Sequence, residues 1–183
     1  MYKRQLYDEI AAPFIPHLRR PASETIGSIP ANAHSALALS ILLDQFPRNL
    51  FREAAQAIVY IHYDRISRAV ASQIRTLELD RAESLYSAPV WRYWFYMPLE
   101  HCESVADHEL FRAALGQMLE QAKRVQDETG VKFVERAMDF EERHLKPLLE
   151  FGRFPWRNKW LGRESTEAER KWLEDHGDKF GTG

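Results

Sequence analysis

The sequence predicts an all-α protein made of antiparallel helix hairpins in a single domain that covers residues 1–183. Apolar residues recur at helical spacing in most segments. No segment alternates apolar and polar residues cleanly, and no Asn-Gly or Asp-Gly hairpin dipeptide occurs. Prolines and glycines fall at the breaks between the periodic segments. Helix pairs of similar length also permit a solenoid-like stack.

The composition restricts the classes of protein that need to be considered. Hydrophobic residues make up 45% of the 183 residues and charged residues 28%, which is typical of a folded domain and excludes disorder. The net charge of −2 provides no overall attraction to nucleic acid or to an anionic membrane surface. No apolar run approaches membrane-spanning length, and the single cysteine, Cys102, cannot form an internal disulfide. Because the N-terminus also lacks an apolar signal-peptide segment, we expect a cytoplasmic protein.

The N-terminal half predicts a helix over Tyr2–Leu18, which Pro13 and Pro16 bend or end. A loop follows in the stretch "RRPASETIGSIPANA". The Ala- and Leu-rich segment from Ala33 predicts a buried helix that stops at Phe46, because proline disfavours helical geometry in the residue before it. A long helix is predicted over about residues 50–77, with "TLELDRAESLYSAP" as a connector.

The C-terminal half begins with "VWRYWFYMPLE", for which strand and short helix are both compatible with the pattern. We predict a short helix that closes at Met97, and then a helix over about residues 101–128. Gly130 separates that helix from another, whose last turn Pro147 should kink. The final helix has Thr166 and Glu169 at capping-box spacing and is expected to end at Gly177.

The segment "LLDQFPRNLFRE" is the first of three that are rich in polar residues. Arg48 and Arg52 are four residues apart, so on one helix they share a face and both guanidiniums can bind a carboxylate or phosphate. In the alternative interpretation, Asp44 pairs with one of these arginines and simply fixes the turn at Pro47.

The second segment is "YMPLEHCESVADHE". Glu100, Glu103 and Asp107 would form one carboxylate stripe on a helix that begins near Pro98. Such a stripe is solvated, paired with cations from elsewhere, or bound to a metal. The Glu-x-x-His spacing of di-metal helix bundles is absent, so we expect no metal and no other cofactor. His101 and Cys102 are adjacent and would point about 100° apart on a helix, which argues against a thiol–histidine pair.

The third segment is "FGRFPWRNKWLGRE", residues 151–164, in which aromatic and basic residues alternate. This pattern suits base stacking beside phosphate contacts, but it equally suits a loop whose aromatic rings anchor it to the helices. The acidic stripe offers an internal partner for its arginines. We therefore favour a docked loop and expect no nucleic-acid partner.

These three blocks, in this order and at these intervals, resemble the uncharacterised family known as domain of unknown function 924, over about residues 7–175. Tyr7-Asp8 and Tyr63-Asp64 add to the similarity, whereas Trp156 stands where one version of the family motif has histidine. The resemblance implies a tetratricopeptide-like right-handed superhelix and no established reaction. It also implies that a set of polar side chains converges: Asp44, Arg48, Arg52, Asp64, Glu100, His101, Glu103, Arg153, Arg157, Asn158 and Arg163.

Three functional hypotheses follow. In the leading one, a helical binding module uses Arg48, Arg52, Arg153 and Arg157 to hold a small anion or an acidic peptide or protein partner. In the second, the protein is an enzyme in which His101, with Glu100 or Glu103, acts as general acid or base. In the third, the cluster is a structural network or an interaction scaffold. The pattern does not predict the oligomeric state.

Overall fold

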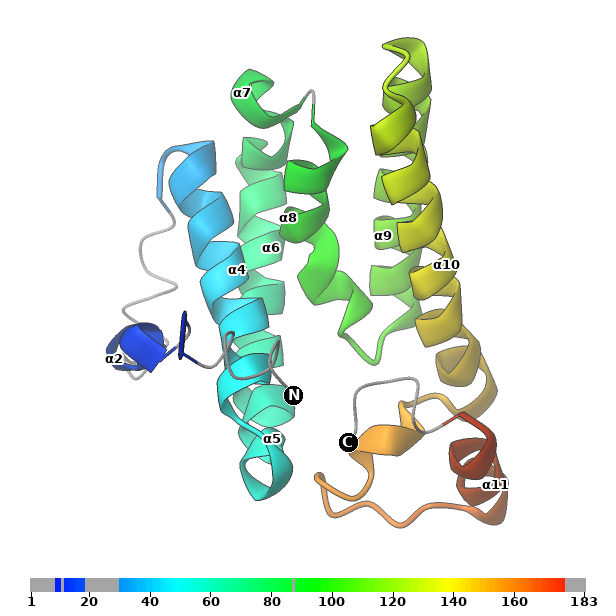
Figure 1. The fold of residues 1–183 in the computed structure, drawn as a ribbon. Coiled ribbons are helices and arrows are strands. Elements are labelled where there is room, and N and C mark those ends of the chain that lie inside the picture. The colour runs from blue at the N-terminus through cyan, green and yellow to red at the C-terminus, as the bar shows by residue number, and fades with distance from the viewer. Residues whose placement is uncertain (1–8, 11, 19–29, 87, 177–183) are drawn as a thin grey trace.

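The structure, a computed structural model, describes residues 9–10, 12–18, 30–86 and 88–176, and it is helical without any strand in these ranges (Figure 1). The principal α-helices, in chain order, are α4 (Ala33–Leu50), α6 (Asp64–Thr76), α8 (Pro89–Glu100), α9 (Val105–Arg124), α10 (Glu128–Phe151) and α11 (Glu167–His176). The shorter helices are η1 (Ala12–Phe14), α2 (Ile15–Leu18), η2 (Glu53–Ala55), α5 (Gln56–Ile58), η3 (Val59–Tyr63), η4 (Leu79–Arg81), α7 (Glu83–Tyr86) and η5 (Pro155–Arg157).

The long helices run up and down in alternation, so consecutive ones are antiparallel (Figure 1). Helix α4 packs against α6 and α8, and α9 packs against α8 and α10. One apolar core holds them together, in which Phe95, Phe111 and Leu115 are fully buried. None of the helices in the described ranges combines the length and the apolar character needed to cross a bilayer.

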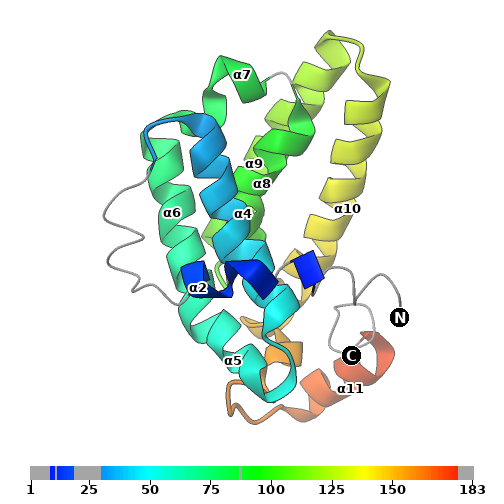
Figure 2. The same ribbon diagram turned by 60° about the vertical axis from the view of Figure 1, so that its left-hand side comes forward.

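A second, smaller core lies at one end of the molecule. There Phe154 and Trp156 pack against Leu145 and Leu148 of α10, and Trp172 of α11 lies against them. The segment between α10 and α11 therefore wraps under the long helices instead of extending into solvent (Figures 1 and 2). The all-α prediction is confirmed, and this docked segment is the element that closes the candidate site.

Several predicted boundaries were wrong, mostly at prolines. Helix α4 continues through Pro47 to Leu50, and α8 contains Pro98. A proline removes one backbone hydrogen bond, which a well-packed last turn tolerates. Phe51 N–H still donates to the Pro47 carbonyl at 2.8 Å. The helix predicted over 101–128 begins instead at Val105, where Ser104 caps it by accepting from Asp107 N–H.

Of the other predicted helix boundaries, some are confirmed and some lie outside the described residues. The capping box at α11 is confirmed, since Thr166 N–H donates to Glu169 at 2.7 Å and Glu169 N–H donates to Thr166 Oγ1 at 3.2 Å. The long helix near 50–77 consists of α5, η3 and α6, and η3 is a π-helical turn. The predicted N-terminal start at Tyr2, most of the first loop and the stop at Gly177 lie outside the described residues.

Candidate functional site

The candidate site lies at the end of the helical bundle where five helix termini meet. Helices α4, α8 and α10 end there, α6 and α9 begin there, and the docked segment 152–166 passes across them (Figure 1). Polar residues from distant parts of the chain therefore converge. Each is attached to a helix end or to the docked segment, so the packing of the bundle determines their positions.

The centre of the site is a chain of buried ion pairs. Arg48 is bonded to Asp64 and lies 3.3 Å from Asp44, one helical turn before it on α4. Arg157 Nη1 donates to the other oxygen of Asp64 at 3.0 Å, and its Nη2 donates to the His101 carbonyl at 2.8 Å. Asp64 therefore bridges an arginine of the first sequence block and one of the third.

The π-helical turn η3 lies immediately before Asp64. Such turns are rare and occur frequently at functional sites. Here Tyr60, within the turn, places its ring 4.4 Å from the guanidinium of Arg157, and Phe154 faces the same guanidinium at 4.8 Å. The cation is thus held by a carboxylate, a carbonyl and two aromatic rings.

His101 forms a close pair with Asp44, its Nδ1 lying 2.8 Å from the Asp44 Oδ1. Burial alone would raise the pKa of Asp44, but His101 and Arg48 outweigh it and hold that pKa below its usual range. Burial and the nearby Arg48 charge lower the pKa of His101 in spite of Asp44. A neutral imidazole that donates Nδ1–H to an ionised carboxylate keeps Nε2 as a proton acceptor.

A pocket of about 240 Å³ opens beside these groups. We call it the arginine–histidine pocket; its lining residues are Arg48, Gln56, Val59, Tyr60, His101, His144, Trp156 and Arg157. Among the described residues, its lining contains two guanidiniums and two imidazoles but no carboxylate. The aspartates that neutralise the guanidiniums therefore do not form its wall.

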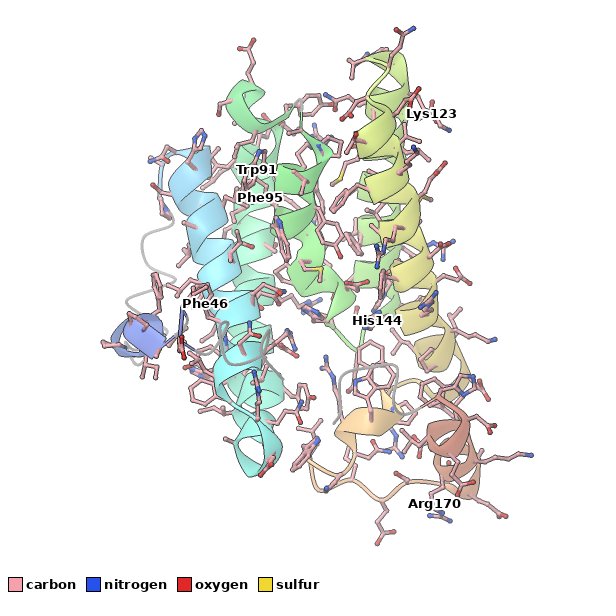
Figure 3. All side chains as sticks on the ribbon, viewed as in Figure 1. Phe46, Trp91, Phe95, Lys123, His144 and Arg170 are labelled. Atoms are coloured by element: carbon pink, nitrogen blue, oxygen red, sulfur yellow. The ribbon has the colours of Figure 1, made fainter. Side chains whose placement is uncertain are left out.

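His144 of α10 is the second histidine of the pocket and lies at the lower end of the bundle, next to the docked segment (Figure 3). Its Nδ1 is 3.0 Å from the Phe140 carbonyl, an acceptor, so Nδ1 carries the proton in the neutral ring. Burial lowers the pKa of His144 to about 3. The Glu100 carboxyl lies 3.5 Å from the same Nδ1.

Glu100 is itself buried, at the C-terminus of α8. Burial, together with the charges of Glu141 and Asp44, raises its pKa to about 8. Its Oε1 has no hydrogen-bond partner among the described residues. Glu100 is therefore an uncharged carboxylic acid at neutral pH, next to an uncharged histidine.

We expect the free energy of unfolding to fall as the pH rises from 6.5 to 8, by up to about 1.4 kcal/mol per pH unit. Over this range folded Glu100, with its pKa raised from 4.5 to about 8, keeps a proton that the unfolded chain has lost. His144 acts in the opposite sense, but below pH 6.5, where the unfolded chain binds a proton that the folded ring, with a pKa of about 3, does not. Urea unfolding at several pH values measures the slope.

The matched test of that pH dependence uses two substitutions. Glu100→Gln should flatten the slope between pH 6.5 and 8, whereas Glu150→Gln, at an exposed position of α10, should leave it unchanged. An unchanged slope in Glu100→Gln would show that another group is responsible.

The other two arginines of the third block, Arg153 and Arg163, are bound in internal ion pairs. Arg163 binds both oxygens of Glu103 at 2.7 and 2.8 Å, and Glu103 also accepts from Phe154 N–H at 2.8 Å. Arg153 binds both oxygens of Glu169 at 2.6 and 2.8 Å. These bidentate pairs fasten the docked segment to the α8–α9 connection and to α11.

Four of the residues predicted for ligand binding converge at the pocket or its ion pairs: Asp44, Arg48, Asp64 and Arg157. The other four lie elsewhere. Arg153 pairs with Glu169 at α11, Asn158 is buried and donates to Ser165 at 3.1 Å, and Arg163 pairs with Glu103. Arg52 lies beyond the end of α4 and is exposed, because the helix ends at Leu50 and the two arginines no longer share one helical face.

The predicted catalytic trio needs a correction. The carboxylate that contacts His101 is Asp44, not Glu100 or Glu103. The carboxylate stripe was also wrong, because Glu100 ends α8, Glu103 lies in the connection, and Asp107 lies in α9, where it accepts from Arg68 at 2.7 Å. The chain leaves helical geometry after Glu100, so the assumed spacing does not apply.

Two other reactive-looking side chains are structural. Cys102 Sγ donates to the Pro98 carbonyl at 3.1 Å, and burial raises the pKa of this thiol to about 12. His108 is fully buried with Nδ1 2.8 Å from Glu141 and Nε2 3.0 Å from the Cys102 carbonyl. Both ring nitrogens of His108 are therefore occupied, in contrast to His101.

Sequence reasoning missed Gln56, Tyr60 and His144 as pocket residues, and it did not place Trp156 in the pocket wall. Tyr60 and His144 lie on amphipathic helices whose polar positions are common. The one available signal was His144 on the apolar stripe near Pro147 at the end of a helix, which indicates burial but not a pocket.

Comparisons with known proteins agree with the resemblance of the three blocks. The sequence profile of a family described as bacterial protein of unknown function (DUF924) matches residues 1–177. A search of curated proteins found no match. A solved structure of a protein of unknown function from Agrobacterium tumefaciens is 29% identical, with a TM-score of 0.61, and the alignment covers 95% of this chain and 84% of that chain. Since the profile matches almost the entire length, the chain belongs to the DUF924 family of bacterial proteins of unknown function.

Proposed function

We propose that this protein is a helical binding module that holds a small anion in the arginine–histidine pocket. The observation that carries the proposal is the composition of the wall, which in the described residues has two guanidiniums and no carboxylate. An anion entering there meets cations first, while Asp44 and Asp64 prevent the two arginines from repelling each other in the empty state.

Unused hydrogen-bonding capacity supports the proposal. A purely structural network satisfies its buried donors, whereas a binding site keeps some of them available. The Nε atoms of Arg48 and Arg157 are buried and have no hydrogen-bond partner among the described residues. Both side chains line the pocket.

The size of the pocket limits the ligand. A volume of about 240 Å³ lies below the roughly 300–1,000 Å³ of pockets for drug-sized molecules. Phosphate, small carboxylic acids, or the carboxylate end of a peptide are of suitable size. Tyr60 and Trp156 supply an aromatic wall beside the cations.

Thermal denaturation with inorganic phosphate and small mono- and dicarboxylates tests the proposal. At ten times its Kd, a bound anion should raise Tm by about 3–6 °C. Arg157→Lys keeps a charge near Asp64 but loses the guanidinium fork, so it should abolish the shift while the protein still folds. The control is Arg124→Lys, an exposed arginine of α9. If a broad panel of anions leaves Tm unchanged in the parent protein, the proposal is wrong.

A second candidate function is general-base catalysis on the bound anion. The observation that favours it is the 2.8 Å contact of Asp44 with Nδ1 of His101, which makes Nε2 the proton acceptor in the pocket wall. Asp44 would be the positioning residue, and the guanidiniums would stabilise developing negative charge. An anion that raises Tm should then also be consumed, and His101→Gln should slow its consumption by at least about 100-fold. If the anion binds but is not consumed, the catalytic function is wrong and only the function as a binding module stands.

We also propose that the helices are arranged as a tetratricopeptide-like superhelix. The antiparallel pairs α4–α6, α8–α9 and α9–α10 support a tetratricopeptide-like superhelix, a fold that commonly binds peptides or proteins along one face. A peptide end is therefore one form of the anion that this pocket would hold.

A further inference from the structure

A line of arginines leads away from the arginine–histidine pocket along helix α6. Arg65, Arg68, Ser72 and Arg75 are spaced i, i+3, i+7 and i+10, so they share one face of the helix. The opposite face, with Ile66, Val70 and Ile74, is buried in the core. The arginine face is therefore turned toward solvent, where Arg65 and Arg68 are exposed and Arg75 is half-buried.

This face borders two hollows, and one of them shares lining residues with the arginine–histidine pocket. A hollow of about 440 Å³ between α6 and α9 is lined by Arg65, Arg68 and Arg75, with Asp107 and Leu110 on its other side. A second hollow, of about 220 Å³, shares Arg65, Arg68 and Asp107 with it. That second hollow shares Tyr60, His101 and Arg157 with the arginine–histidine pocket. We call this row of three neighbouring hollows the α6 groove.

The charge of the groove is unbalanced in favour of cations. Arg68 is paired with Asp107 at 2.7 Å. In the described ranges, neither Arg65 nor Arg75 forms an ion pair, and in the larger hollow Asp107 is the one acidic lining residue facing three arginines. The carboxylates that reach the smaller hollow are already engaged, since Asp64 binds Arg157 and Glu103 binds Arg163.

We propose that the α6 groove binds the acidic C-terminal end of another protein, an inference that rests on the proposed function of the pocket. Its terminal carboxylate occupies the arginine–histidine pocket, and acidic side chains upstream lie along Arg65, Arg68 and Arg75. Ten residues of α6 span about 15 Å. An extended peptide covers the same distance with about five residues. The ligand is thus a short acidic tail in extended conformation.

The lining favours a peptide over a nucleic acid. Single-stranded nucleic acids are usually bound by aromatic rings that stack on the bases. The larger hollow instead has Ala69, Leu99 and Leu110 beside its arginines and no aromatic ring among its described lining residues. Small aliphatic contacts of this kind suit the backbone and the methylene groups of an extended peptide.

Fluorescence anisotropy with a labelled acidic peptide of about five alternating Asp and Glu residues and a free C-terminus tests this inference. Its affinity should be at least about tenfold higher than that of the Asn/Gln analogue, and high salt should reduce the difference. The double substitution Arg65→Gln/Arg75→Gln should weaken binding by about tenfold, with about two- to fivefold from each of the two arginines. Arg124→Gln, an exposed arginine outside the groove, should have no effect.

Other measurements separate this inference from the proposed function. C-terminal amidation of the peptide should lower its affinity, as should Arg157→Lys. If phosphate raises Tm but the acidic peptide binds no better than its Asn/Gln analogue, the peptide inference is overturned and the anion pocket stands. If amidation leaves the affinity of the peptide unchanged, the peptide inference is also overturned. The peptide inference is also overturned if a short oligothymidylate binds more tightly than the peptide and if the Arg65→Gln/Arg75→Gln variant weakens that binding.

Discussion

We expect Asp64→Ala to lower the free energy of unfolding by about 3–5 kcal/mol, the range for removing one partner of a buried ion pair. Asp64 is bonded to both Arg48 and Arg157, and its side chain is 8% exposed. Without it, two guanidiniums that are mostly buried lose their shared counter-ion and repel each other. Urea unfolding followed by circular dichroism measures the loss.

The control for this prediction is an ion pair on the surface. Glu78 and Arg81 lie 3.8 Å apart with more than half of each side chain exposed. Removing Glu78 as Glu78→Ala should therefore change stability by less than about 1 kcal/mol. If Asp64→Ala is equally mild, the buried pairs contribute little, and the idea that they hold the helix ends together is wrong.

Asp64→Ala also separates the structural interpretation of the cluster from the binding interpretation. If the pocket admits anions, added acetate should restore part of the lost stability, because its carboxylate can replace that of Asp64 between the arginines. In a closed structural network, acetate should have the same small effect on the variant and on the parent protein.

The second large effect is expected for Phe154→Ala, at about 3–5 kcal/mol, the usual cost of removing a fully buried aromatic ring. Phe154 is fully buried and stacks on Trp156 at 4.6 Å. Its ring also lies edge-to-face with the rings of His108 and His144, and it faces the Arg157 guanidinium. The substitution leaves a cavity at the point where the docked segment meets the helices.

The matched control is Leu149→Ala, on α10 near the same end of the molecule. Leu149 is 63% exposed, so its truncation should cost about 0.5 kcal/mol or less. Because Phe154 anchors Arg157, Phe154→Ala should also weaken any anion-dependent rise in Tm. A Phe154→Ala protein as stable as the parent would contradict the role of this ring as the anchor of the segment.

The structure shows what the aromatic and basic residues of segment 151–164 do. Its rings are anchors, since Phe154 and Trp156 belong to the small core against α10. Two of its arginines are consumed by Glu169 and Glu103. Of the four cations of the segment, Arg157 is the one that lines the pocket, and its Nε has no hydrogen-bond partner among the described residues.

Local patterns predicted the helices because a helix is stabilised by contacts between residues three or four apart. The apolar spacing identified the cores of α4, α6, α9 and α10, and the Thr166–Glu169 pair identified the start of α11. The same rules failed at Pro47 and Pro98, where tertiary packing keeps the last turn of α4 and of α8 helical in spite of the proline.

The sequence by itself determined the all-α class, the family and the three blocks of polar residues. The tertiary structure alone decided which of those residues meet. The Asp44–His101 contact spans 57 residues and the Arg157–Asp64 contact 93. No local period encodes such pairings, because they depend on how helix ends align after packing. For the same reason the pocket gained His144 and Tyr60, while Arg52 and Arg153 were left outside it.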